Sequence, residues 1–173
     1  MATLFITGGN RGIGLAILKR FAAEGYNIVV STRKQYPEFE SKCREMENIH
    51  GVTIHHAYME LDNPDSISHG LKNIDALGII PDVVVNNAGI FHEKMLLFSK
   101  MEDIKKVFQI NYFSVLQITQ HFAKAMMRMG GGGDNKYLFY CSRQQSTISS
   151  GIWCKQSCLE PIYQKFSTRV SSI

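Results

Sequence analysis

A glycine-rich stretch stands between the first apolar run of the chain and its first helical pattern. It reads ITGGNRGIG over residues 6–14, with glycines at 8, 12 and 14. Glycine has no Cβ, so it permits a tight turn and a close approach of the backbone to a pyrophosphate. A helix that starts there presents free N–H groups and its positive dipole end to the same anion. The stretch therefore predicts a dinucleotide-binding site, the alternative being a glycine-rich turn without a ligand.

Short β-rich runs alternate with helical patterns along the chain. The runs span residues 3–6, 27–31, 52–57, 82–85 and 137–141. The intervening patterns place apolar residues at helical spacing, namely Ile13, Ile17 and Phe21, then Phe39, Cys43 and Met46, then Ile67, Leu71 and Ile74. This alternation predicts an α/β fold with a doubly wound, parallel sheet of strand order 3-2-1-4-5. The length of 173 residues predicts one domain.

Residues that begin and end helices stand at the edges of these patterns. The first helix is expected from Gly12 to Glu24, because Gly25 is suited to a left-handed C-terminal cap. A second helix is expected to begin at Pro37, and a third after Asn63 and Pro64.

A long helix is expected from about Asp103 to Arg128, and it carries apolar residues on two sides. One stripe consists of Ile104, Val107, Val115, Ile118 and Phe122, and the other of Phe113, Leu116, Ala123 and Met127. A single sheet can cover only one of them. The second stripe is either buried by neighbouring elements or forms an interface with another copy, so helix 103–128 is a candidate for homo-oligomer contacts.

Composition and charge exclude several classes of protein. The formal charge of +4 comes from scattered Lys and Arg, which does not describe a nucleic-acid-binding stripe. No apolar stretch approaches the roughly 20 residues of a membrane helix, and MATLFITGG does not resemble a signal peptide. The four cysteines show no disulfide-framework spacing, which favours a reducing cytoplasm. A metal site is not expected, because Cys154 and Cys158 lack a second pair of ligands at zinc-site spacing.

Several motifs in this order resemble the short-chain dehydrogenase/reductase family. The glycine spacing is one, followed by LD at 61–62, NNAG at 86–89 and IN at 110–111. The resemblance implies a Rossmann-like, NAD(P)-binding domain over residues 1–173. It also implies that the cofactor phosphates are lined by Gly8, Arg11, Gly12, Ile13 and Gly14. By the same resemblance Asp62 faces the adenine, and Asn87, Ala88 and Gly89 face the ribose and nicotinamide.

The residues after the second β-rich run bear on the choice of cofactor. An NAD site needs a carboxylate about 20 residues past the glycines, where it binds the ribose 2′-hydroxyl. This chain has Ser31, Thr32, Arg33 and Lys34 there. Arg33 and Arg11 can pair with a 2′-phosphate as charge-assisted donors, so NADP(H) is favoured over NAD(H), the alternative being that both are solvated surface charges.

The family resemblance also implies a catalytic tetrad of Asn, Ser, Tyr and Lys. Asn111 matches the Asn, and Ser142 matches the Ser. The segment CKQSCLEPIYQKF resembles the family's Tyr-led helix, but it places Cys154 and Cys158 where Tyr and Lys are expected. A general acid typically contributes about a hundred- to ten-thousand-fold in rate. We therefore expect impaired or no catalysis by the unmodified chain.

The family resemblance implies two further strands after the fifth, whereas only SSI follows Val170. The domain is therefore expected to be incomplete at its C-terminus and to lack those two strands. Three functional hypotheses follow. The first is an NADP(H)-dependent oxidoreductase acting on a small carbonyl or alcohol, with weak or no turnover. The others are a catalytically silent dinucleotide-binding or subunit protein, and a truncated product without a function.

Overall fold

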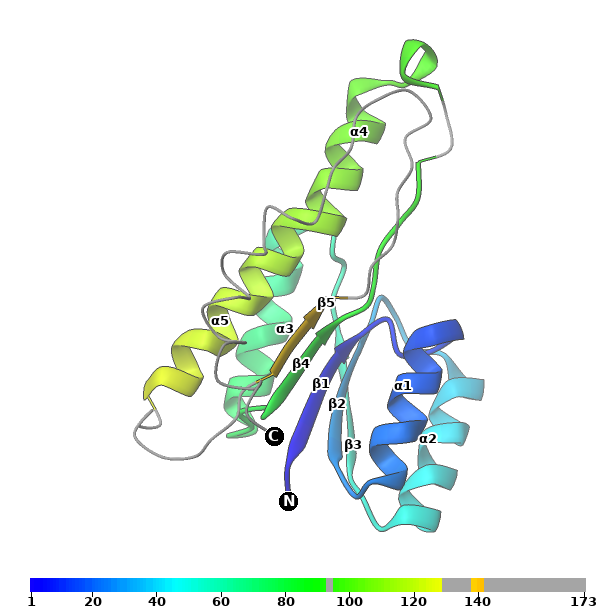
Figure 1. The fold of residues 1–173 in the computed structure, drawn as a ribbon, viewed down its shortest axis with the longest axis vertical. Coiled ribbons are helices and arrows are strands. Elements are labelled where there is room, and N and C mark those ends of the chain that lie inside the picture. Colours follow the sequence, from blue (N-terminus) through cyan, green and yellow to red (C-terminus); the bar gives the residue numbers. More distant parts are fainter. Residues whose placement is uncertain (93–94, 129–137, 142–173) are drawn as a thin grey trace, which may run out of the picture.

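The computed structural model describes residues 1–92, 95–128 and 138–141. Within them, five strands form one parallel sheet in the order β3-β2-β1-β4-β5 (Figure 1). The strands are β1 (Thr3–Thr7), β2 (Asn27–Thr32), β3 (Ile54–Tyr58), β4 (Val83–Asn86) and β5 (Leu138–Cys141). The predicted order is confirmed, and each predicted run overlaps a strand.

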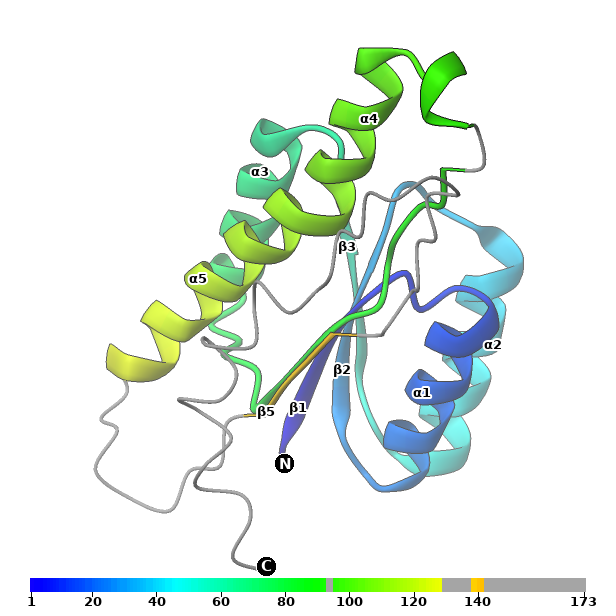
Figure 2. The same ribbon diagram turned by 45° about the horizontal axis from the view of Figure 1, so that its top comes forward.

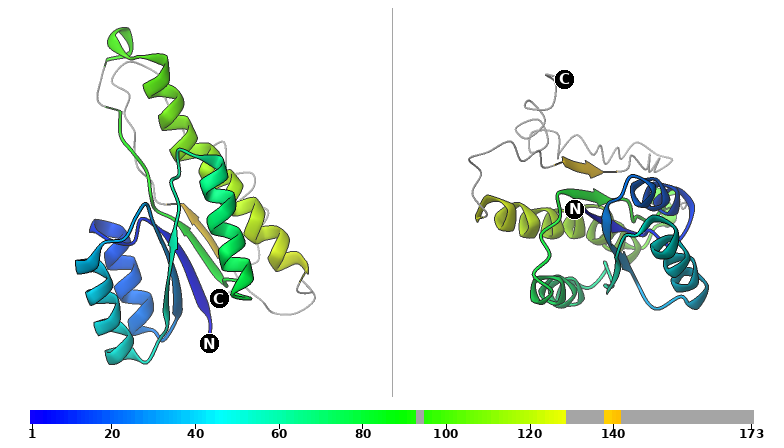
Figure 3. Two further views of the ribbon diagram at one scale, coloured as in Figure 1. Left: turned by 180° about the vertical axis from the view of Figure 1, so that it is seen from behind. Right: turned by 90° about the horizontal axis from the view of Figure 1, so that it is seen from below.

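Helices cover both faces of the sheet. Helices α1 (Gly12–Ala23) and α2 (Pro37–His50) lie on one face, and α3 (Pro64–Ala76) and α5 (Ser114–Arg128) lie on the other (Figures 2 and 3). Helix α4 (Met101–Phe108), preceded by the short 3₁₀ helix η1 (Leu96–Phe98), extends beyond the sheet. This two-sided cover is the doubly wound arrangement that the alternation predicts.

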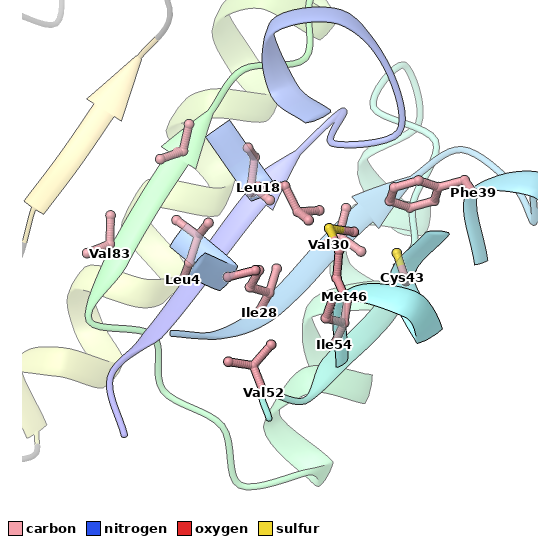
Figure 4. Close-up of a cluster of buried hydrophobic side chains, with 13 residues drawn as sticks. Leu4, Leu18, Ile28, Val30, Phe39, Cys43, Met46, Val52, Ile54 and Val83 are labelled. Carbon is pink, nitrogen blue, oxygen red and sulfur yellow. The ribbon is translucent and has the colours of Figure 1, made fainter. Parts of the chain in front are cut away.

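Side chains from the two faces of the strands form separate cores. Leu4, Ile28 and Ile54 point towards α1 and α2, where they meet buried residues such as Leu18 and Met46 (Figure 4). The opposite core is formed by Phe5, Val29, Ala57, Val84, Ile67, Leu71, Ile74, Ile118 and Phe122, among others. The alternation of sides along each strand gives both cores their residues.

Helix α1 buries a different set of residues from the apolar ones at helical spacing, Ile13, Ile17 and Phe21. Ile13 is 71% exposed, and the face that α1 buries consists of Gly14, Leu18 and Ala22. Ile17 and Phe21 are only partly buried at the margin of the core. Small residues at 14 and 22 let this side of the helix pack closely, so the apolar residues at helical spacing do not mark its buried side.

The long helix is present but contains an irregular turn. It begins at Met101, and a π-helical turn, η2 (Gln109–Phe113), joins α4 to α5. Four residues of the first predicted stripe, Val107, Val115, Ile118 and Phe122, are buried, and Ile104 is partly so. In the second stripe Phe113 and Met127 are exposed, at 52% and 70%. Both side chains therefore leave most of their surface uncovered by the other described residues.

Cys43 of α2 should be unreactive while the protein is folded. Burial, with the charges of Glu47 and Glu40, raises the pKa of its thiol from 9.0 to about 12. Because the thiolate is the nucleophile, iodoacetamide at pH 8 should leave Cys43 unmodified unless guanidinium is present. Peptide mapping by mass spectrometry checks this, and rapid alkylation of the native protein would contradict it. The raised pKa also means that folding stability declines as the pH rises from 9.0 towards about 12.

Candidate dinucleotide-binding site

A cleft of about 870 Å³ opens at the carboxyl ends of β1, β2 and β4. Strand β1 lies between β2 and β4 in the sheet, so the direction of the connections reverses there, which is where ligands bind in folds of this type. Except for Asp62, all residues predicted to bind the cofactor line this cleft: Gly8, Arg11, Gly12, Ile13, Gly14, Arg33, Asn87, Ala88 and Gly89.

The glycine-rich loop forms one wall of the cleft and leads into α1. Gly8 and Gly12 have φ angles of 68° and 55°, a region that side chains with a Cβ rarely adopt. Gly14 is in close contact with the other wall, because a Cβ there would collide with the carbonyl oxygen of Gly8 and the side-chain amide of Asn87. The loop therefore needs glycine at these positions.

The first turn of α1 keeps its positive end available to a ligand. Its N-cap, Arg11, makes no side-chain capping hydrogen bond, and the first turn holds no acidic residue. By contrast, the first turn of α3 is capped by Asn63, whose side-chain oxygen accepts from the N–H groups of Asp65 and Ser66. Because Gly12, Ile13 and Gly14 line the cleft, the uncapped turn suits an anion such as a pyrophosphate.

Hydrogen bonds join the loops after β1 and β4. The side-chain amide of Asn87 donates to the carbonyl oxygens of Thr7 and Gly8, both at 3.1 Å. In return the hydroxyl oxygen of Thr7 accepts from the backbone N–H groups of Asn87 and Ala88, at 3.1 and 3.0 Å. These four hydrogen bonds hold the two walls in one geometry.

Asn111 lies in the π-helical turn η2 and fixes the next part of the wall. Its side-chain oxygen accepts from the N–H of Ile90 at 2.9 Å, and its amide donates to the carbonyl of Ile90 at 2.8 Å. Ile90 and its neighbour Gly89 both line the cleft. Asn111 therefore acts on the backbone that follows NNAG.

Asp62 lies beside the cleft and is not among its lining residues. One of its carboxylate oxygens lies 2.9 Å from the ammonium of Lys106, and this hydrogen bond lowers the pKa of Asp62. Asp62 borders a different hollow, which α4 and η2 line. Its neighbour Leu61 lines the cleft, and the positive charge of Arg33, another lining residue, also lowers the pKa of Asp62, so Asp62 lies at the margin of the cleft.

Several lining residues were not predicted to bind the cofactor, although three of them stand in the quoted motifs: Asn10, Tyr36, Met59, Leu61, Ile90 and Ile110. Each adjoins a residue that was predicted or closely follows a strand end, which is the signal that could have identified it. Ser142, Cys154 and Cys158 lie outside the described residues.

The described residues contain neither a cluster of metal-binding side chains nor a membrane-spanning helix. In this part of the chain no group of three or more His, Cys, Asp or Glu side chains is placed to hold a metal ion. Among the same residues, no helix has the length and apolar character that crossing a bilayer requires.

Residues 2–134 match the family model for short chain dehydrogenase. A Bacillus subtilis protein named uncharacterized oxidoreductase YvrD is 32% identical over 130 residues, which is 75% of this chain and 48% of that protein. The 3-oxoacyl-[acyl-carrier-protein] reductase FabG of Aquifex aeolicus is 30% identical over 73% of this chain and 51% of its own length. The chain thus spans about half the length of these relatives.

Solved structures show the same similarity. The alcohol dehydrogenase of Thermococcus sibiricus, complexed with 5-hydroxy-NADP, has 28% identity and a TM-score of 0.67, over 76% of this chain and 55% of that one. A short chain dehydrogenase of Burkholderia cenocepacia in complex with NADP has 28% identity and a TM-score of 0.64, over 71% and 50% of the two chains.

Proposed function

Because this chain belongs to the short-chain dehydrogenase family, we propose that its cleft binds NADP(H). The solved relatives that carry NADP support this choice, as does the chemistry of the cleft. The observation that carries it is the wall after β2, where Ser31, Thr32 and Arg33 line the cleft and no described carboxylate does. A 2′-phosphate would be repelled by a carboxylate and attracted by a guanidinium.

Each part of such a cofactor would be bound by different residues of the cleft. The uncapped first turn of α1 would hold the pyrophosphate, and the exposed side chains of Arg11 and Arg33 would pair with the 2′-phosphate. The segment Asn87–Gly89 would contact the ribose and nicotinamide side, with Asn111 holding the backbone at Ile90. The cofactor itself supplies the hydride of an oxidoreductase reaction.

We propose that reduction of a small carbonyl, or oxidation of the alcohol, is weak or absent in this chain. Ser142 and Asn111 are the candidate catalytic residues that remain from the family tetrad. Cys154 and Cys158 replace the Tyr that would protonate the carbonyl oxygen and the Lys that would lower its pKa. The second candidate function is therefore a catalytically silent dinucleotide-binding or subunit protein. Turnover assays with simple ketones and aldehydes distinguish the two.

Arg33→Asp should reverse or weaken the preference for NADPH. Losing a charge-assisted hydrogen bond to the 2′-phosphate removes about 1.5–3 kcal/mol, so NADPH affinity should fall roughly ten- to a hundred-fold. NADH affinity should rise modestly, because the new carboxylate can accept from the 2′-hydroxyl. Fluorescence titration with both cofactors measures the ratio. Equal affinities of the unmodified chain for NADPH and NADH would remove the basis of the proposal.

We also propose that a second copy of the chain packs against the outer side of helices α4 and α5. Exposed Met101, Phe113 and Met127 lie along these helices and the turn between them. The proposal rests on these exposed apolar side chains, because apolar surface left exposed in one copy can be buried against another. Light scattering of the parent and of Phe113→Glu would test it, because a charge at the centre of the contact should shift the population to monomer.

A further inference from the structure

Tyr36 forms part of the cleft wall just beyond the end of β2. The residue is half-buried, and its ring packs against the core formed with α1 and α2. Its backbone carbonyl accepts from the N–H groups of Phe39 and Glu40, at 2.9 and 3.0 Å, so α2 begins directly behind it. Packing against this core thus restrains the ring, and the backbone hydrogen bonds hold the residue at the start of α2.

The turn that leads to Tyr36 is also held in place. The hydroxyl of Thr32 donates to the carbonyl of Lys34 at 2.9 Å, and the ammonium of Lys34 lies 5.7 Å from the centre of the Tyr36 ring. A cation at this distance from a ring is attracted by its π-electrons, which further restrains the ring. Arg33, between Thr32 and Lys34 in the sequence, lines the cleft next to the ring.

Apolar side chains from another strand border the same cleft. Met59 and Leu61 follow β3 and line it, and the N–H of Met59 donates to the carbonyl of Thr32 at 2.9 Å. This end of the cleft, between the strand ends of β2 and β3, therefore combines an aromatic ring with apolar groups and the cation of Arg33. A purine with a phosphorylated ribose has matching chemistry, because its base is flat with apolar faces and its phosphate is anionic.

We infer that the adenine of the cofactor stacks on Tyr36, which is thus a positioning residue for the adenine, while Arg33 binds the 2′-phosphate. The inference rests on the proposed NADP(H) binding. It predicts different effects of substitutions at Tyr36 and at Arg33. NADPH and NADH carry the same adenine, so a change at Tyr36 should weaken both by the same factor, whereas a change at Arg33 alters their ratio.

The test compares NADPH and NADH affinities for the parent, Tyr36→Leu and Tyr36→Phe. Base stacking on an aromatic residue is worth about 1–3 kcal/mol, so Tyr36→Leu should lose roughly ten-fold in affinity for each cofactor. Tyr36→Phe keeps the ring and should stay within about two-fold of the parent. Tyr58→Leu is the matched control, because Tyr58 lies on β3, bonds Glu40 through its hydroxyl at 3.0 Å and does not line the cleft. Its cofactor affinities should be unchanged.

Failure of the inference is distinguishable from failure of the proposed function. If the parent binds neither cofactor, both the proposed NADP(H) binding and the stacking inference are refuted. If the parent binds NADPH and Tyr36→Leu binds it equally well, only the inference falls. Should Tyr36→Leu fail to fold, Tyr36→Trp decides the question by titration with 2′,5′-ADP, which carries the adenine and 2′-phosphate without nicotinamide. Quenching of the added indole emission, measured against the parent with its single Trp153, supports stacking, and unchanged emission overturns it.

Discussion

Gly14→Ala should nearly eliminate NADPH binding. Gly14 is buried in the first turn of α1, where an added methyl group would collide with the carbonyl oxygen of Gly8 and the amide of Asn87. Neither neighbour can yield easily, because that same amide joins the two walls through hydrogen bonds to Thr7 and Gly8. Displacing the loop should cost at least two charge-assisted hydrogen bonds to the pyrophosphate, and therefore roughly a hundred-fold in affinity.

Gly25→Ala provides the matched control for this substitution. Gly25 has a φ of 79°, so alanine is strained there too, but the added methyl group would meet nothing within 4 Å. It lies after the last turn of α1, at the end away from the cleft. In both variants the free energy of unfolding should fall by about 1–3 kcal/mol, which denaturant titration measures. Only Gly14→Ala should lose NADPH binding in a fluorescence titration. Parent-like NADPH affinity in Gly14→Ala would argue against the proposed site.

The sequence predicted the sheet and most of the cleft because local patterns specify both. Buried parallel strands appear as short apolar runs, and a strand followed by glycines and a helix start has one common use in such folds. The order β3-β2-β1-β4-β5 and the clustering of the glycine loop with Asn87–Gly89 follow from these patterns. The start of α3 was also predicted correctly, because Asn63 caps the helix and Pro64 follows it.

Other features depend on contacts between distant residues, which periodicity does not encode. Gly14 is buried in close contact with the side-chain amide of Asn87, whereas Ile13 of the same turn is 71% exposed despite its apolar side chain. The π-helical turn coincides with Asn111, whose side chain bonds the backbone of Ile90, far away in the sequence. Asp62 pairs with Lys106 from α4, a partner that no local motif indicates.

Replacing Cys154 by Tyr and Cys158 by Lys together should raise carbonyl reduction by the NADPH-saturated chain. The unmodified chain should show negligible turnover, because a thiol reaches roughly 4 Å less far from the backbone than a phenol. This difference exceeds the variation in length that a hydrogen bond tolerates, so the thiol would not reach the substrate oxygen. A thiol, whose reference pKa is about 8.5, is also a possible acid only on paper. Position 158, four residues on, holds no cation that could lower the pKa of the acid.

The size and pattern of the effect follow from the way the two groups act. A positioned general acid contributes about a hundred- to ten-thousand-fold, so the double variant should exceed the parent by roughly a hundred-fold where a substrate can still bind. Cys154→Tyr alone and Cys158→Lys alone should do much less, because the phenol needs the ammonium and the ammonium has no role without the phenol. Turnover with simple ketones and aldehydes, measured on metal-free protein, checks the series. Substantial activity in the parent chain would refute this interpretation and make the thiols themselves candidate catalysts.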